Sequence, residues 1–153
     1  MNIFYKLLIM FCLLFSEISI GSTEIPVDLS ELKCMTDNIY FEARSEPIIG
    51  QVLVGKTVIN RLQDSKWPNT ICKVVYQKSQ YSWTASPLNE IDDYKSYALA
   101  QSIAFLLLRH KDNEDPYLGD HYLRCDYRDK VSWWKSMRFL GQVGKHCFYT
   151  THL

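Results

Sequence analysis

Two glutamates four residues apart, Glu42 and Glu46, are the side chains in this chain best suited to acid–base chemistry. Residues at i and i+4 share one face of a helix, so both carboxylates would point the same way in a continuous helix. Pro47 disfavours helical backbone at Glu46, which leaves Glu42 better placed. A carboxyl group on an apolar rim loses hydration, and its pKa rises. A carboxyl group that stays protonated near neutral pH is what acid-catalysed glycoside cleavage requires.

A structural interpretation of both glutamates stays open. Carboxylates at helix ends are commonly solvated or paired with a cation, and Arg44 lies between these two. Glu46 could form a salt bridge or a cap where the next helix begins. Glu42 differs because it follows Met35 and Ile39 at helical spacing, at the edge of an apolar stripe.

Three amphipathic helices are predicted to position these groups. The first follows a capping box at 28–31, with Asp28 or Ser30 as the cap, and the second spans 48–63. The third begins at Asp92 or Asp93 and ends near residue 109. Their apolar stripes comprise Leu32, Met35, Ile39 and Ala43; Ile48, Val52, Gly55, Ile59 and Leu62; and Tyr97, Ala100, Ala104 and Leu107. Gly55 within its stripe indicates a close crossing of two helices.

The remaining segments are predicted to be short. Asn69 caps a brief helix that ends near Tyr76, and 111–116 is a polar loop. Alternating residues at 80–84 and 121–127 predict strands. This order indicates a single α+β domain, mostly helical with a small antiparallel sheet.

Residues 1–22 have the layout of a secretory signal peptide. Lys6 precedes the apolar run 7–15, which is short for a membrane span, and small residues follow at Ser19, Gly21 and Ser22. An uncleaved N-terminal anchor is the alternative. The domain at 23–153 is therefore expected to be secreted, periplasmic or in the cell envelope, with no membrane contact beyond the leader, and to be a monomer.

Four cysteines lie beyond the leader: Cys34, Cys72, Cys125 and Cys147. An even number in an exported chain predicts two disulfides. Among the three possible pairings we favour Cys34–Cys72, which ties the Glu42 helix to a later segment, and Cys125–Cys147. Neither the cysteines nor the four scattered histidines have metal-ligand spacing, so no metal or cofactor is expected.

The charge balance argues against a nucleic-acid partner. Lys and Arg number 17, Asp and Glu number 17, and the formal net charge is 0. Proteins that neutralise phosphates present a strongly basic face. Aromatic residues make up 14% of the chain, and such side chains either stack on sugars or fill a core.

An ordered series of motifs resembles the SleB/CwlJ-type cell-wall hydrolases. The series comprises Asn38, Tyr40, Glu42-Ala43-Arg44-Ser45-Glu46-Pro47, Gly50-Gln51, Asn60-Arg61, Trp67-Pro68-Asn69-Thr70, Gln80-Tyr81-Ser82-Trp83-Thr84, Asp115-Pro116, His121-Tyr122 and Gly144-Lys145-His146-Cys147-Phe148-Tyr149. Ser45 stands where the family usually has glycine, and the segment before His121 is about one residue short. Cys125 and Cys147 are not expected from the family.

The resemblance implies a compact lysozyme-like domain related to lytic transglycosylases. Its catalytic glutamate maps onto Glu42, and its substrate is the β-1,4 bond between N-acetylmuramic acid and N-acetylglucosamine in peptidoglycan. Such an enzyme leaves 1,6-anhydro-muramic ends; Glu46, if it faces the cleft, would permit hydrolysis instead. Residues implied to line the sugar cleft are Gln80, Ser82, Trp83, Thr84 and Tyr122. An N-acetylmuramoyl-L-alanine amidase and a non-catalytic peptidoglycan-binding module remain the alternatives.

Overall fold

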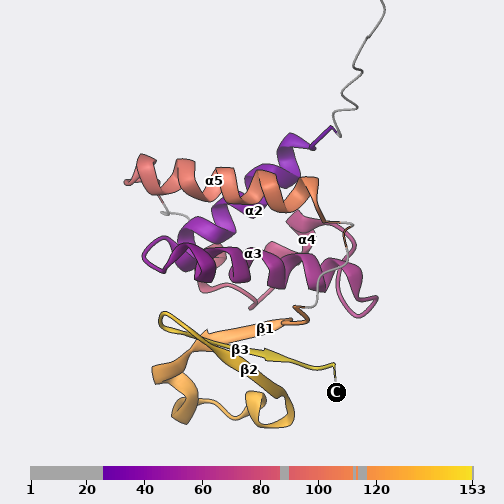
Figure 1. Ribbon diagram of the computed structural model, residues 1–153, viewed down its shortest axis with the longest axis vertical. Helices are drawn as coiled ribbons and strands as arrows, with labels where there is room; N and C mark the ends of the chain where they lie inside the picture. Colours follow the sequence, from indigo (N-terminus) through magenta and orange to yellow (C-terminus); the bar gives the residue numbers. More distant parts are fainter. Residues whose placement is uncertain (1–25, 87–89, 112, 114–116, 153) are drawn as a thin grey trace, which may run out of the picture.

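The computed structural model describes residues 26–86, 90–111, 113 and 117–152, and Figure 1 shows a helical layer packed on a small sheet. The helices are α2 (Leu29–Ala43), α3 (Ile48–Gln63), α4 (Ile71–Val75) and α5 (Tyr94–Arg109). The strands are β1 (His121–Arg124), β2 (Arg138–Val143) and β3 (His146–Thr150), and 3₁₀ turns occur at Ser82–Ala85, Cys125–Lys130 and Trp133–Ser136. The predicted α+β architecture is confirmed. The predicted leader and part of the 111–116 loop lie outside the described residues.

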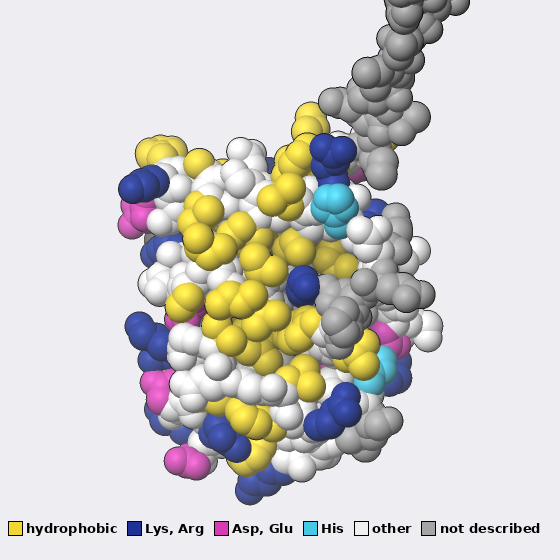
Figure 2. Space-filling view, in the orientation of Figure 1, with side chains coloured by type: hydrophobic (Ala, Val, Ile, Leu, Met, Phe, Trp, Pro, Cys, Tyr) yellow, Lys and Arg dark blue, Asp and Glu magenta, His cyan; other side chains and the backbone are white. Residues whose placement is uncertain are grey.

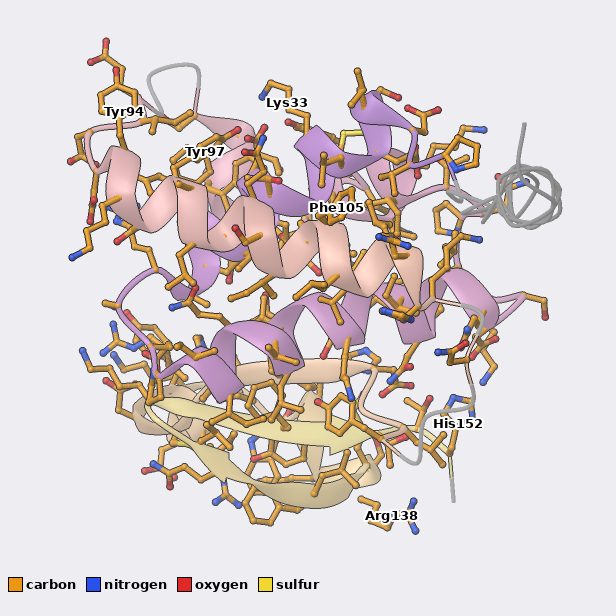
Figure 3. The ribbon with its side chains drawn as sticks, turned by 45° about the horizontal axis from the view of Figure 1, so that its top comes forward. Lys33, Tyr94, Tyr97, Phe105, Arg138 and His152 are labelled. Atoms are coloured by element: carbon orange, nitrogen blue, oxygen red, sulfur yellow. A yellow bond between two sulfur atoms is a disulfide. The ribbon has the colours of Figure 1, made fainter. Side chains whose placement is uncertain are left out.

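Helix α2, which carries Glu42, is fixed at its start and along its length. Asp28 is the N-cap and accepts hydrogen bonds from the amides of Ser30 and Glu31. Two tyrosine bonds then join α2 to the α5 region: Tyr40 donates to Asp92 at 2.8 Å, and Tyr97 donates to Asp37 at 2.8 Å. Figure 3 labels Tyr97 on α5 beside Lys33, whose ammonium also contacts Asp37. These contacts hold the end of α2 in place.

Helix α3 contacts α2, α4 and α5 and lies next to β1 (Figure 1). The close crossing predicted at Gly55 is confirmed, because a Cβ there would lie 2.4 Å from Leu107 Cδ1 and 3.1 Å from Ile39 Cδ1. The predicted stripe is partly wrong, since Ile48 is 61% exposed. Neighbours on several sides bury a broader arc of α3 than one stripe, including the polar Gln51, Thr57 and Arg61.

Two of the short segments differ from their predictions. Thr70, rather than Asn69, caps α4, because its side chain accepts the amide of Lys73. The segment predicted as a strand at 80–84 forms a 3₁₀ turn at Ser82–Ala85 instead. In the described part of the chain no strand pairs with it, and Thr84 Oγ1 donates back to the carbonyl of Tyr81 at 2.8 Å. Alternation alone cannot supply a pairing partner.

The sheet is antiparallel with the order β1-β3-β2, and all of β3 is buried. β1 ends at Arg124 rather than at Tyr127, because the chain turns into a 3₁₀ helix at Cys125. Both favoured disulfides, Cys34–Cys72 and Cys125–Cys147, are present. The first ties α2 to α4 and the second ties the turn after β1 to β3. None of the helices in the described residues has both the length and the hydropathy of a membrane-spanning segment.

Candidate active site

The end of α2 faces a polar cleft of about 360 Å³, which we call the Glu42 cleft. Its walls come from α2, α3, the segment around the first 3₁₀ turn, β1 and β3. The lining residues are Phe41, Glu42, Arg61, Gln80, Tyr81, Ser82, Tyr122, Leu123, Arg124 and His146. Glu42 is the sole carboxylate among these lining residues.

Glu42 is held in a state suited to proton transfer. Burial raises the pKa of its carboxyl group, and the hydrogen bond from Tyr122 and the charge of Arg61 oppose that rise without cancelling it. The Tyr122 hydroxyl donates to Glu42 Oε2 at 3.2 Å. Burial and then the nearby Glu42 charge raise the pKa of Tyr122 well above its usual range, so this phenol stays a donor. The pair combines a carboxyl group that readily binds a proton with a fixed donor for its charged form.

Among the described residues, Arg61 binds a backbone carbonyl and a phenol and forms no ion pair with a carboxylate. Its Nε donates to the carbonyl of Asp120 at 2.7 Å, and a guanidinium nitrogen donates to Tyr81 Oη at 3.2 Å. The guanidinium also lies 4.3 Å from the centre of the Trp67 ring. Its neighbour Asn60 donates to two backbone carbonyls, those of Tyr117 and Gly119. Both side chains therefore tie α3 to the segment that leads into β1.

Glu46 lies in a different environment from Glu42, although only four residues separate them in sequence. Its carboxylate is buried and accepts the amide of Lys145 at 2.8 Å, in the turn between β2 and β3. A Cβ on Gly144 would lie 1.8 Å from Glu46 Oε2, so the turn closes directly on this side chain. Helix α2 ends at Ala43, and Glu46 is absent from the lining of the Glu42 cleft.

The structure brings three of the five predicted sugar-contacting residues to the Glu42 cleft: Gln80, Ser82 and Tyr122. Trp83 does not line it. Its ring stacks on Phe41 at 4.8 Å and meets Tyr76 edge-on, so it packs against the core. Thr84 also lies outside the lining and holds the 3₁₀ turn through its bond to Tyr81.

Several lining residues were not singled out from the sequence as site residues: Phe41, Tyr81, Leu123, Arg124 and His146. A period of two would have identified one of them, because Arg124 follows Tyr122 on the same face of β1. His146 pairs with Arg124 across the β1–β3 register, which only the sheet topology reveals.

A larger groove of about 430 Å³ runs between α3 and α5, away from Glu42. Its lining is mainly apolar, with Ile48, Ile103 and Leu106 among the contributors and no carboxylate. Figure 2 shows apolar side chains gathered on this face. The groove therefore lacks the acid–base groups that the Glu42 cleft provides. Nowhere in the described residues do three or more His, Cys, Asp or Glu side chains form a potential metal site.

The sequence matches the model of a known family. The sequence profile described as Cell Wall Hydrolase matches residues 45–149, more than half of the chain. The chain belongs to the cell wall hydrolase family. Glu42 lies three residues before the start of this match.

Among curated proteins, the chain is similar to spore cortex-lytic enzymes. It is 26% identical to that of Halalkalibacterium halodurans over 83% of this chain and 37% of the relative. It is 31% identical to that of Bacillus cereus over 41% of this chain and 25% of the relative. The chain thus spans well under half the length of these relatives.

Two solved structures share the fold of this member of the cell wall hydrolase family. The catalytic domain of the germination-specific lytic transglycosylase SleB from Bacillus anthracis superposes with a TM-score of 0.65 and 22% identity, covering 82% of this chain and 98% of that one. The catalytic domain of Bacillus cereus SleB gives 0.64 and 23%, covering 85% and 98%. The predicted compact, lysozyme-like fold is thereby confirmed.

Proposed function

We propose that this protein cleaves the β-1,4 bond between N-acetylmuramic acid and N-acetylglucosamine in peptidoglycan, as a lytic transglycosylase. The observation that carries the proposal is the Glu42 cleft, whose single carboxylate is partly buried, has a raised pKa and accepts a bond from Tyr122. Membership of the cell wall hydrolase family supports peptidoglycan as the substrate.

Glu42 begins the reaction as a general acid. Burial raises the pKa of its carboxyl group and so favours the protonated form, and the proton passes to the glycosidic oxygen as its bond to the muramic C1 breaks. Positive charge develops on the sugar ring at this point. The carboxylate left behind is stabilised by the Tyr122 hydroxyl and by the charge of Arg61.

Glu42 then acts as a general base. The muramic C6 hydroxyl oxygen attacks C1, and its proton returns to Glu42, which closes a 1,6-anhydro ring. The glycosidic bond to the leaving sugar is exchanged for an intramolecular glycosidic bond between C1 and O6, and the enzyme recovers its starting protonation state. The nucleophile belongs to the substrate, so this route needs a single carboxylate.

The position of Glu46 favours this route over hydrolysis. A hydrolytic glycosidase uses a second carboxylate to activate water or to form a covalent intermediate. We propose a structural role for Glu46 instead, since its carboxylate is bound to the Lys145 amide outside the Glu42 cleft.

Gln80 and Ser82 are proposed to bind the substrate within the Glu42 cleft, together with Tyr122. Trp83 and Thr84 are proposed to support the turn that presents Ser82. We propose that the protein acts outside the cytoplasm at the cell wall, since its proposed substrate is peptidoglycan and residues 1–22 have the layout of a signal peptide.

Mass spectrometry of the fragments released from purified peptidoglycan tests the proposal. Wild type should release muropeptides with 1,6-anhydro ends, and Glu42→Gln should release none. Glu90→Gln is the matched control, because Glu90 is exposed and absent from the lining of the Glu42 cleft. Reducing muramic ends would favour hydrolysis. Free stem peptides, or products unaffected by Glu42→Gln, would refute the glycosidase mechanism.

A further inference from the structure

A second cavity, of about 280 Å³, lies beside the Glu42 cleft, and we call it the His121 cavity. It is lined by Lys66, Trp67, Gln77, Gln80, His121 and Thr151. One shared lining residue and one side-chain contact connect the His121 cavity to the Glu42 cleft. Gln80 lines both spaces, and the Arg61 guanidinium of the Glu42 cleft stacks on the ring of Trp67.

The half-buried His121, which lines this cavity, pairs with the buried carboxylate of Asp120, and the proposed reaction uses neither group. Asp120 is 1% exposed, and its Oδ1 lies 2.9 Å from His121 Nδ1. The amide and the hydroxyl of Thr151 also donate to this carboxylate. Meanwhile the Asp120 carbonyl accepts the bond from Arg61, so one residue anchors the walls of both spaces.

This pairing fixes the tautomer of His121. Burial opposes ionisation of Asp120, but the bonds from His121 and Thr151 outweigh it, and the pKa of Asp120 is lowered. Asp120 is then an acceptor, so His121 Nδ1 carries the hydrogen. Burial lowers the pKa of His121, which leaves Nε2, on the ring edge away from Asp120, as an uncharged acceptor.

The His121 cavity combines a hydrogen-bond acceptor, an aromatic ring and side-chain amides, which together can bind a sugar. Trp67 is half-buried and offers an apolar ring, and Gln77 and Gln80 offer amides for hydroxyl and N-acetyl groups. Lys66 also lines the cavity, and its ammonium lies 3.6 Å from Asp64 Oδ2. Such a mixture of one aromatic surface and a few placed polar groups is typical of carbohydrate and small-ligand sites.

We propose that the His121 cavity binds a further N-acetylated sugar of the glycan strand, beyond those held in the Glu42 cleft. The inference rests on the proposed function, because it extends the same glycan from one space to the next across Gln80. His121 Nε2 accepts a hydrogen bond from that sugar, and Trp67 packs against its ring. The protein would thus favour long strands over short ones.

The test compares a tetrasaccharide with an octasaccharide of alternating N-acetylglucosamine and N-acetylmuramic acid. His121→Asn is the informative variant, because its amide nitrogen can keep the bond to Asp120 while the Nε2 acceptor is lost. Trp67→Leu removes the aromatic ring and retains apolar contact with Arg61. Tyr94→Ala is the control, since Tyr94 is an aromatic residue 77% exposed at the start of α5.

We expect each cavity variant to raise KM for the octasaccharide by about tenfold, the effect of losing one good contact. Values of kcat, and KM for the tetrasaccharide, should stay within about twofold, and Tyr94→Ala should match wild type. Equal effects on both substrates, or no effect on either, would overturn the assignment of this cavity. Failure of wild type to cleave either substrate would instead refute the proposed function.

Discussion

Replacing Glu46 with glutamine separates the two roles that this residue can have. The buried Glu46 carboxylate accepts the Lys145 amide at 2.8 Å and holds the β2–β3 turn against the start of α3. Glutamine has nearly the same shape and retains an oxygen acceptor, but it lacks the charge. The substitution therefore weakens this contact without creating a cavity.

The magnitude follows from the strength of the bond that changes. A hydrogen bond to a charged group stabilises a protein by about 1.5–3 kcal/mol, and one between neutral groups by about 0.5–1.5 kcal/mol. We expect Glu46→Gln to lower the free energy of unfolding by about 1 kcal/mol, which corresponds to roughly 4 °C in Tm for a domain of this size. Glu46→Ala, which leaves the amide without its acceptor, should cost about 2 kcal/mol.

The assay measures urea unfolding and kcat on the same preparations, at a temperature where each variant is folded. We expect kcat of Glu46→Gln to remain within about threefold of wild type, while Glu42→Gln loses at least about a hundredfold. A loss of a hundredfold or more for Glu46→Gln, with unchanged stability, would refute the structural role. Glu46 would then be a catalytic carboxylate, and the mechanism would be hydrolytic.

Three further predictions concern the Glu42 cleft and its frame. Because folding raises the pKa of Glu42 above its ordinary 4.5, ionisation destabilises the native state. Glu42→Gln should therefore have a larger free energy of unfolding than wild type at pH 7. The difference should vanish below pH 4.5 and grow by about 1.4 kcal/mol per pH unit between the unfolded and folded pKa values of Glu42. Equal urea midpoints at pH 7 would contradict this prediction. Tyr122→Phe removes a hydrogen-bond donor to the ionised Glu42 carboxylate. We therefore expect kcat to fall about tenfold and the limb of the pH–rate profile set by Glu42 to move to higher pH. A shift of this limb to lower pH would contradict the prediction. Replacing Cys34 and Cys72 together by alanine frees a loop with a sequence separation of 38 and should lower the free energy of unfolding by about 4 kcal/mol; a urea-measured loss under 1 kcal/mol would show that the bridge constrains little.

Local signals in the sequence determined the helices. Asp28 and Asp93 cap α2 and α5, and both were among the caps predicted from the sequence. They could be predicted because a capping side chain bonds to amides two or three residues away. Apolar spacing likewise predicted the extent of α3, and Gly55 indicated its close crossing. Capping contacts join residues that are close in sequence, and a close helix crossing depends on a glycine. Both can therefore be predicted from the sequence alone.

Tertiary structure decided which of the candidate side chains meet. Tyr122 reaches Glu42 across 80 residues, and Lys145 reaches Glu46 across 99, so the local pattern that favoured Glu42 could not identify the partner of either glutamate. The segment at 80–84 alternates like a strand, but no strand in the described part of the chain pairs with it, and residues Ser82–Ala85 form a 3₁₀ turn. The residue types suited to acid catalysis could be identified from the sequence. Their burial, which sets the pKa of Glu42, depends on neighbours that only the folded chain brings together.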